Sequence, residues 1–122
     1  MGRGDGKPPP YIRNEEISVY MLLWEFAPRR GAEEDFERAY GPAGVWAQFF
    51  IRDSEYRGTK LIRSITDDRQ YITIDTWTSR EAYETFRIRW QAEYAEVDRR
   101  CESLTAYEKA VGTFVDIDLA AK

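Results

Sequence analysis

The chain has 122 residues, a formal net charge of −4, one cysteine and no histidine. This length suits a single domain, and the even spread of both charge signs argues against nucleic-acid binding. Without histidine and with one cysteine, the chain excludes histidine-dependent catalytic triads, histidine-ligated metals and haem, cysteine metal cages and internal disulfides, so we expect no metal and no cofactor.

Both ends of the chain are predicted to be tails. Residues 1–16 are rich in glycine, proline and charge and contain the run Pro8-Pro9-Pro10. They bury too little apolar surface to fold, so a flexible tail is favoured over a polyproline ligand. Residues 118–122 are expected to fray. No apolar run approaches the roughly 20 residues of a membrane span, and no signal-peptide pattern is present, so we expect a cytoplasmic protein without membrane contact.

Residues 17–26 are β-branched, aromatic and nearly uncharged, which predicts the first strand. Alternate side chains of a strand point to opposite faces of the sheet. Here both sets are apolar, so both faces must be covered. The two sets are Ile17, Val19, Met21 and Leu23, and Tyr20, Leu22, Trp24 and Phe26.

A helix broken in two follows this strand. Apolar residues recur at helical spacing from Ala32 to Ala43, but Pro42 between two glycines interrupts the pattern. A second, short helix then carries Trp46, Phe49 and Phe50. A broken helix over a sheet favours a crevice lined by such aromatic side chains.

Residues 59–66 and 69–77 flank the turn dipeptide Asp67-Asp68 and are predicted to form a hairpin. In its second strand, Ile72 and Ile74 share one face, which we expect to lie under the helices. The other face is mixed aromatic and polar, which is more typical of a cavity or an interface. It carries Tyr71, Thr73, Asp75 and Trp77.

A long helix is predicted after the hairpin. Thr78 and Glu81 form a capping box, and apolar residues then continue at spacings of three and four to Leu104. Cys101 lies on this apolar stripe, and we interpret it as core packing. A second capping box from Thr105 predicts a short helical turn that Gly112 stops, followed by a last strand over residues 113–117.

The resulting order is β-α-β-β-α-β, the α+β ferredoxin-like split pattern with a four-stranded antiparallel sheet and helices on one face. The predicted domain spans residues 17–117. The other sheet face needs a cover, and a second copy packed sheet to sheet as a two-fold dimer is the economical one. If the set with Trp24 and Phe26 meets the partner, a charge at either position disrupts the homodimer.

Several segments resemble the antibiotic biosynthesis monooxygenase-like family. They are LLWEF at 22–26, the turn PRRG, ERAYGPAGVWAQFF at 37–50, YITIDTWTSREAYETF at 71–86 and CESLTAYEKAVGTF at 101–114. The resemblance covers residues 17–114, and the last segment is similar to uncharacterised bacterial members. It implies a dimeric α+β barrel. For activity it implies cofactor-free oxygenases, haem-degrading enzymes, isomerases or proteins without a reaction.

The resemblance extends to the scaffold and not to a known active site. The haem-degrading branch uses an asparagine, a tryptophan and a histidine; here Trp24 and Phe86 stand nearest to the first two positions, and histidine is absent. The quinone-forming branch relies on asparagine, tryptophan, tyrosine and arginine, and the only asparagine is Asn14. Haem degradation in its known form is therefore disfavoured.

The chemistry that this scaffold would support is oxidation of an electron-rich phenol or anthrone by dioxygen. Asp75 could act as the base if burial raises its pKa, and Arg63 could stabilise a phenolate. An ion pair or plain solvation is the alternative for each. An aromatic pocket is the other candidate feature, with ordinary core packing as its alternative. Its predicted lining is Trp24, Trp46, Phe50, Trp77, Phe86, Trp90 and Tyr94.

Three functions stay open at this point. The first is a cofactor-independent monooxygenase-like oxidoreductase that acts on a small aromatic or polyketide-like molecule. The second is a non-catalytic dimer that binds a small ligand or a partner, and the third is a structural dimer with a filled core. A cavity with a polar group of strongly shifted pKa favours the enzyme, and an all-apolar cavity favours the binder.

Overall fold

The computed structural model describes residues 19–117, so both predicted tails lie outside the described residues. Four strands form one sheet in the order β2-β3-β1-β4, and every neighbouring pair is antiparallel. The strands are β1 (Tyr20–Pro28), β2 (Tyr56–Arg63), β3 (Tyr71–Trp77) and β4 (Thr105–Val115). The helices are α1 (Glu33–Tyr40), α2 (Val45–Phe50), α3 (Arg80–Arg89) and α4 (Gln91–Cys101), with a short 3₁₀ turn at Glu102–Leu104.

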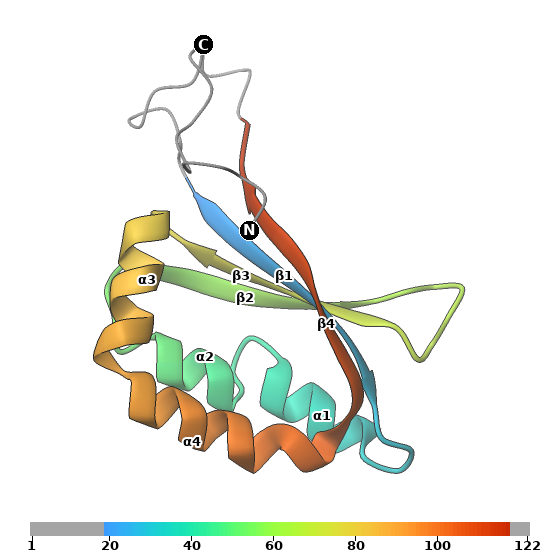
Figure 1. Cartoon of the computed structure of the whole chain (residues 1–122). Helices are drawn as coiled ribbons and strands as arrows, with labels where there is room; N and C mark the ends of the chain where they lie inside the picture. The colour runs from blue at the N-terminus through green and yellow to red at the C-terminus, as the bar shows by residue number, and fades with distance from the viewer. Residues whose placement is uncertain (1–18, 118–122) are drawn as a thin grey trace.

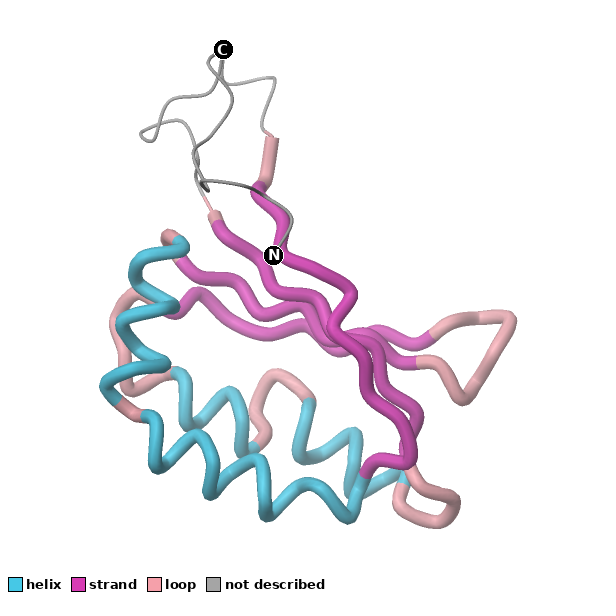
Figure 2. The backbone as a smooth tube through the Cα atoms, viewed as in Figure 1, coloured by secondary structure: helices cyan, strands magenta, loops and turns pink. Residues whose placement is uncertain are grey.

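The helices all lie on one face of the sheet (Figure 1). The sheet is twisted and curves around them, and the β2–β3 hairpin extends past the helical layer (Figure 2). This arrangement confirms the predicted α+β class and the split β-α-β-β-α-β order, with one broken helical segment in each crossover.

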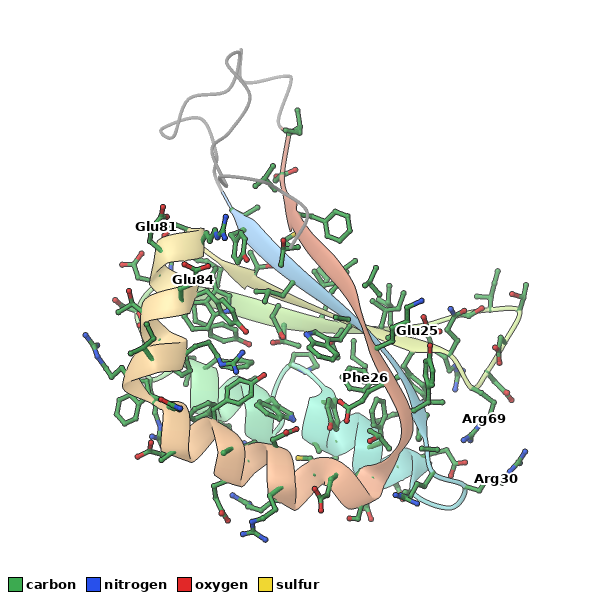
Figure 3. The ribbon with its side chains drawn as sticks, viewed as in Figure 1. Glu25, Phe26, Arg30, Arg69, Glu81 and Glu84 are labelled. Carbon is green, nitrogen blue, oxygen red and sulfur yellow. The ribbon has the colours of Figure 1, made fainter. Side chains whose placement is uncertain are left out.

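On β3 the helices cover the face of Tyr71 and Trp77, which was predicted to form a cavity or an interface. Tyr71 and Trp77 are 3% and 0% exposed, whereas Ile72 and Ile74 lie on the uncovered face. The prediction that the isoleucines lie under the helices is therefore wrong. On β1 the covered set includes Phe26, whose ring centroid lies 4.8 Å from that of Tyr40. Figure 3 shows Phe26 toward the helices and Glu25 on the outer side.

Aromatic packing accounts for this choice of face. Helices α1 and α2 present large rings, and these pack edge-on or tilted against the rings of the sheet. The Tyr71 hydroxyl on the covered face also finds a partner there, because it donates to Glu37 of α1. The alternative dimer interface, in which Trp24 and Phe26 would contact a partner subunit, is therefore also wrong, since both residues face the helices.

The break between α1 and α2 was predicted correctly. It depends on a tight turn at Gly44. A Cβ at Gly44 would lie only 2.2 Å from the carbonyl oxygen of Ala39, so the chain needs glycine here. The Gly44 backbone N–H donates to the Gly41 carbonyl oxygen at 3.0 Å. This tight turn brings Trp46 and Phe50 onto the covered face of the sheet.

The second crossover is two helices rather than one. Trp90 leaves helical geometry at φ −109° and ψ 33°, which ends α3 and starts α4. The Arg52 guanidinium lies 4.8 Å from the Trp90 ring centroid. At the start of α3, Ser79 is the residue that caps: its hydroxyl accepts from the Ala82 N–H at 3.0 Å, in place of the predicted Thr78 cap.

Strand β4 replaces the predicted helical turn after Thr105. Its eleven residues pair along the whole of β1, with Glu108 opposite Phe26. A threonine followed three residues later by a glutamate is a capping pattern, but here a register shift beside Ala27 puts Thr105 and Glu108 on one face of the strand. The ladder with β1 satisfies more backbone groups than a single helical turn would, and it therefore decides the structure. The last strand is thus longer than the predicted 113–117.

Candidate functional site

A cavity of about 370 Å³ lies between the covered face of the sheet and the helices. Every strand and every helix contributes to its wall. The strands supply Trp24, Phe26, Thr59, Thr73, Asp75 and Glu108, and the helices supply Tyr40, Trp46, Phe50, Arg87, Tyr94 and Asp98. Six of these twelve residues are aromatic and six are polar or charged, so the wall combines apolar rings with groups that can orient a small molecule.

Asp75 lies at the centre of the sheet, on the wall that β3 forms. It is opposite Leu22 of β1 and Thr59 of β2. The Thr59 hydroxyl donates to Asp75 Oδ1 at 2.6 Å. Since this uses the only hydroxyl proton of Thr59, the Tyr56 hydroxyl is the donor in its own hydrogen bond to Thr59 Oγ1. A chain of two hydrogen bonds thus holds the carboxylate in place.

Burial raises the pKa of Asp75 to about 6, and the hydrogen bond from Thr59 opposes part of this rise. Within residues 19–117, Asp75 forms no ion pair, so the arginine partner considered as an alternative is not found there. The carboxyl group therefore changes protonation state near neutral pH, where a general base is most effective.

Arg87 of α3 supplies the positive charge of the cavity wall. Its guanidinium carbon lies 3.7 Å from the centroid of the Tyr94 ring. Its Nη1 donates to the Tyr83 hydroxyl at 2.8 Å. Tyr83 and Arg87 are four residues apart on α3, and Tyr94 follows on α4, so the two tyrosines hold the guanidinium between the helices.

Two further carboxylates lie where the cavity opens to solvent. Asp98 of α4 and Glu108 of β4 are both exposed and both line the cavity. Partial burial and the negative charge of Asp98 raise the pKa of Glu108. The two groups therefore lie close enough to repel each other.

Trp46 combines an aromatic wall with an unpaired polar atom. It is 9% exposed, and its buried indole N–H has no hydrogen-bond partner among the described residues. It lies beside the Tyr40 hydroxyl and the Cys101 thiol, but forms a hydrogen bond of normal geometry to neither. Cys101 is 3% exposed, in agreement with its predicted place in the core.

The structure brings together five of the residues that the sequence singled out: Trp24, Trp46, Phe50, Asp75 and Tyr94 all line the cavity. The remaining aromatic candidates do not line it. Trp77 and Phe86 are 0% exposed and form core around Phe50. Trp90 lies at the α3–α4 junction, against Arg52.

Arg63 lies away from the cavity. It is exposed at the far end of β2, with its guanidinium carbon 6.0 Å from the Tyr71 ring centroid. There it lines a wider depression of about 620 Å³ with the exposed residues Ile62, Ile65 and Asp68. Because this depression is open to solvent, it does not exclude water from a bound molecule. The two predicted catalytic residues, Arg63 and Asp75, therefore do not line the same cavity.

The cavity residues that the sequence analysis missed carry two kinds of signal. Arg87 follows Tyr83 by one helical turn, so helical periodicity alone places them on one face. Thr59 lies opposite Asp75 on the neighbouring strand β2, which a correct hairpin register would have shown. Glu108 carried no usable signal, because its segment was interpreted as helical.

Within residues 19–117, no group of three or more acidic or cysteine side chains gathers as metal ligands. None of the described helices is long and apolar enough to cross a membrane.

The comparisons with known proteins bear on the fold. No family profile and no curated protein matches the sequence. Solved structures do match. SnoaB, a cofactor-independent oxygenase from Streptomyces nogalater, aligns in a mutant form with a TM-score of 0.62 and 18% identity over 86% of this chain and 99% of its own.

Two other structures align similarly. A protein from Bordetella bronchiseptica that is provisionally assigned as an antibiotic biosynthesis monooxygenase has a TM-score of 0.63 and 20% identity, over 83% of this chain and 99% of its own. Rv0793 from Mycobacterium tuberculosis has a TM-score of 0.59 and 17% identity, over 84% and 99%. The chain thus has the fold of the antibiotic biosynthesis monooxygenases, as its sequence segments predicted.

Proposed function

We propose that the protein is a cofactor-independent monooxygenase-like enzyme that oxidises a small aromatic or polyketide-like molecule in the cavity. The observation that carries this proposal is Asp75: a carboxyl group with a pKa raised to about 6 lies on the wall of a cavity that six aromatic side chains also line. Catalytic bases are tuned in this way, whereas a cavity for binding alone needs no such group. The monooxygenase-like fold supports the same conclusion.

The reaction that we propose needs only the substrate and dioxygen. The Asp75 carboxylate takes a proton from an anthrone or an electron-rich phenol and leaves a delocalised anion. For an anthrone, the anion gives electrons to dioxygen, a carbon–oxygen bond forms, and loss of water leaves the quinone. Anthrone and dioxygen therefore become anthraquinone and water, with the substrate as the reductant.

Arg87 takes the role that the sequence analysis gave to Arg63. Its guanidinium lies on the cavity wall and is held by Tyr83 and Tyr94. A fixed positive charge beside an aromatic pocket stabilises a developing phenolate without having to reorganise. The rings of Trp24, Trp46 and Phe50 exclude water from the substrate, which strengthens this electrostatic effect.

A non-catalytic ligand-binding protein is the second candidate. Asn14, the only asparagine, lies outside the described residues, so residues 19–117 lack the asparagine of both known branches of the family. The same aromatic cavity would then hold a ligand without converting it.

We also propose that the protein is a homodimer that packs through the uncovered sheet face. This face carries aliphatic side chains on three neighbouring strands, and Ile62 and Phe114 are 47% and 43% exposed. Contiguous apolar surface of this kind favours a partner, and a second copy supplies a matching surface. We place the protein in the cytoplasm, where the thiol of Cys101 stays reduced.

The test is oxygen uptake with anthrone, followed also by the absorbance of the quinone. We expect turnover by the native protein and a loss of at least about a hundredfold in Asp75→Asn, which cannot take up the proton. Asp35→Asn is the matched control, since Asp35 pairs with Arg38 on the exposed side of α1. Anthrone binding without turnover would favour the second candidate, and turnover that is equal in both variants would remove Asp75 from the mechanism.

A further inference from the structure

The charge of the cavity wall is unbalanced. Three carboxyl groups, those of Asp75, Asp98 and Glu108, line it against the single guanidinium of Arg87. Neither Asp98 nor Glu108 forms an ion pair within residues 19–117. A neutral or anionic ligand would leave this negative charge uncompensated beside it, whereas a cation would offset it.

The two outer carboxylates come from opposite walls. Asp98 follows Tyr94 by one turn of α4, so it lies on the helix face that lines the cavity. Glu108 is opposite Phe26 in the register of β4 with β1, which puts it on the covered face of the sheet. The pKa of the Tyr40 hydroxyl is raised mainly by burial. The negative charges of Asp98 and Glu108 raise it further, so both carboxylates lie near the Tyr40 ring.

Aromatic rings complete the environment that a cation prefers. Tyr40, Trp46 and Tyr94 line the same cavity, and the ring centroids of Trp46 and Tyr94 lie 5.1 Å apart. The faces of such rings attract ammonium groups. The cavity therefore offers both ring faces and carboxylates, which is the combination that binds an organic cation.

We infer that the cavity selects an aromatic ligand that carries a protonated amine, with the rings against Trp24 and Trp46 and the ammonium group between Asp98 and Glu108. This inference rests on the proposed function, because it names the charge class of the molecule that the same cavity takes. It assigns a specificity role to two residues that lie at the cavity opening, away from the Asp75 carboxylate on the sheet.

Three fluorescent probes of one ring system test the inference: 9-anthracenylmethylamine, 9-anthracenemethanol and 9-anthracenecarboxylate. We expect the amine to bind about tenfold more tightly than the alcohol at low salt, and the carboxylate to bind most weakly. In Asp98→Asn/Glu108→Gln the ratio of amine affinity to alcohol affinity falls to about twofold or less. Added salt reduces the preference in the native protein, since both carboxylates are exposed.

Glu102→Gln is the control for the loss of a negative charge outside the cavity. Glu102 is exposed just after α4 and does not line the cavity. This variant keeps the full preference for the amine. Equal binding of all three probes, or a preference that survives in the double variant, overturns the inference. If anthrone is still turned over in an Asp75-dependent manner in that case, the proposed function stands and only the charge class is wrong. If no probe binds and no anthrone is oxidised, both fail.

Discussion

The two faces of this sheet are both apolar, yet they differ in kind. The covered face is built from rings, with Phe26, Tyr71 and Trp77 packed against the aromatic side chains of α1, α2 and α3. The uncovered face carries aliphatic side chains, chiefly Ile62, Ile72 and Ile74, and none of the four described helices lies over it (Figure 1).

The difference shows why one face holds a cavity. Rigid rings meet at fixed angles and leave space where three or more of them converge, whereas short branched side chains fill a flat surface evenly. The covered face also carries Thr59, Thr73 and Asp75, which need internal hydrogen-bond partners. Aromatic and polar content, rather than apolarity alone, thus distinguishes the ligand side of the sheet from the side that we propose meets a second copy.

The largest expected effect tests whether the covered face depends on its rings. Phe86 is 0% exposed, and its ring centroid lies 5.0 to 5.8 Å from those of Phe49, Phe50 and Trp77. Phe86→Ala should lower the free energy of unfolding by about 3 to 5 kcal/mol in urea denaturation. Ile88→Ala on the same helix, where the side chain is 76% exposed, should change it by less than about 0.5 kcal/mol. Similar losses in both variants would contradict the assignment of faces.

The uncovered face gives the next largest effect. Ile74→Glu places a carboxylate in the proposed interface of each subunit, and two-fold symmetry repeats the cost of removing it from water, even with Lys60 opposite it on β2. The dimer dissociation constant should rise about a thousandfold, or about 4 kcal/mol, in analytical ultracentrifugation. Ile65→Glu, at the fully exposed hairpin loop, should leave it unchanged. A native protein that is monomeric at high concentration would rule out this interface.

The pH dependence of stability sharpens the contrast between a buried acid and the surface acids. The folded-state pKa of Asp75 is about 6, above its ordinary value of 3.8, so between these values the folded state binds more protons than the unfolded state. Stability therefore falls as the pH rises from about 4 to about 6. The native protein should lose about 2 to 3 kcal/mol relative to Asp75→Asn across this window. Urea denaturation at pH 4 and pH 7, at one protein concentration, measures this difference. A constant difference would show that Asp75 is not desolvated.

The smallest effect concerns the hydrogen bond that orients Asp75. Thr59→Val removes a donor to the charged carboxylate, so the pKa of Asp75 rises further and the acid limb of the pH–rate profile moves to higher pH. Stability should fall by about 1 to 2 kcal/mol, since the Tyr56 hydroxyl also loses its acceptor. Thr73→Val is the matched control on the same cavity wall. An acid limb that stays in place would contradict Asp75 as the titrating base.

Much of the fold could be predicted from local patterns. The first strand, the broken helix and the hairpin all follow from residue types and spacings that act over a few neighbours, such as Pro42 between two glycines. The order of elements then leaves few topologies, and the split pattern is one of them.

What could not be predicted depends on contacts between distant segments. Both strand faces are apolar, so only the aromatic side chains of α1 and α2 decide which face they cover. Pairing with β1 decides that Thr105 begins a strand. For the site, Asp75 was identified by its position between aromatic residues. Arg63 was named and Arg87 was not considered, because the position of a residue on a strand does not tell which end of the sheet the cavity occupies.

The distribution of the four tryptophans has an optical consequence. Trp24 and Trp46 line the cavity, whereas Trp77 is fully enclosed in the core and Trp90 stacks under the Arg52 guanidinium. Contact quenching by a bound aromatic molecule would therefore be strongest for Trp24 and Trp46. Intrinsic emission can thus report whether the cavity is occupied without any added label.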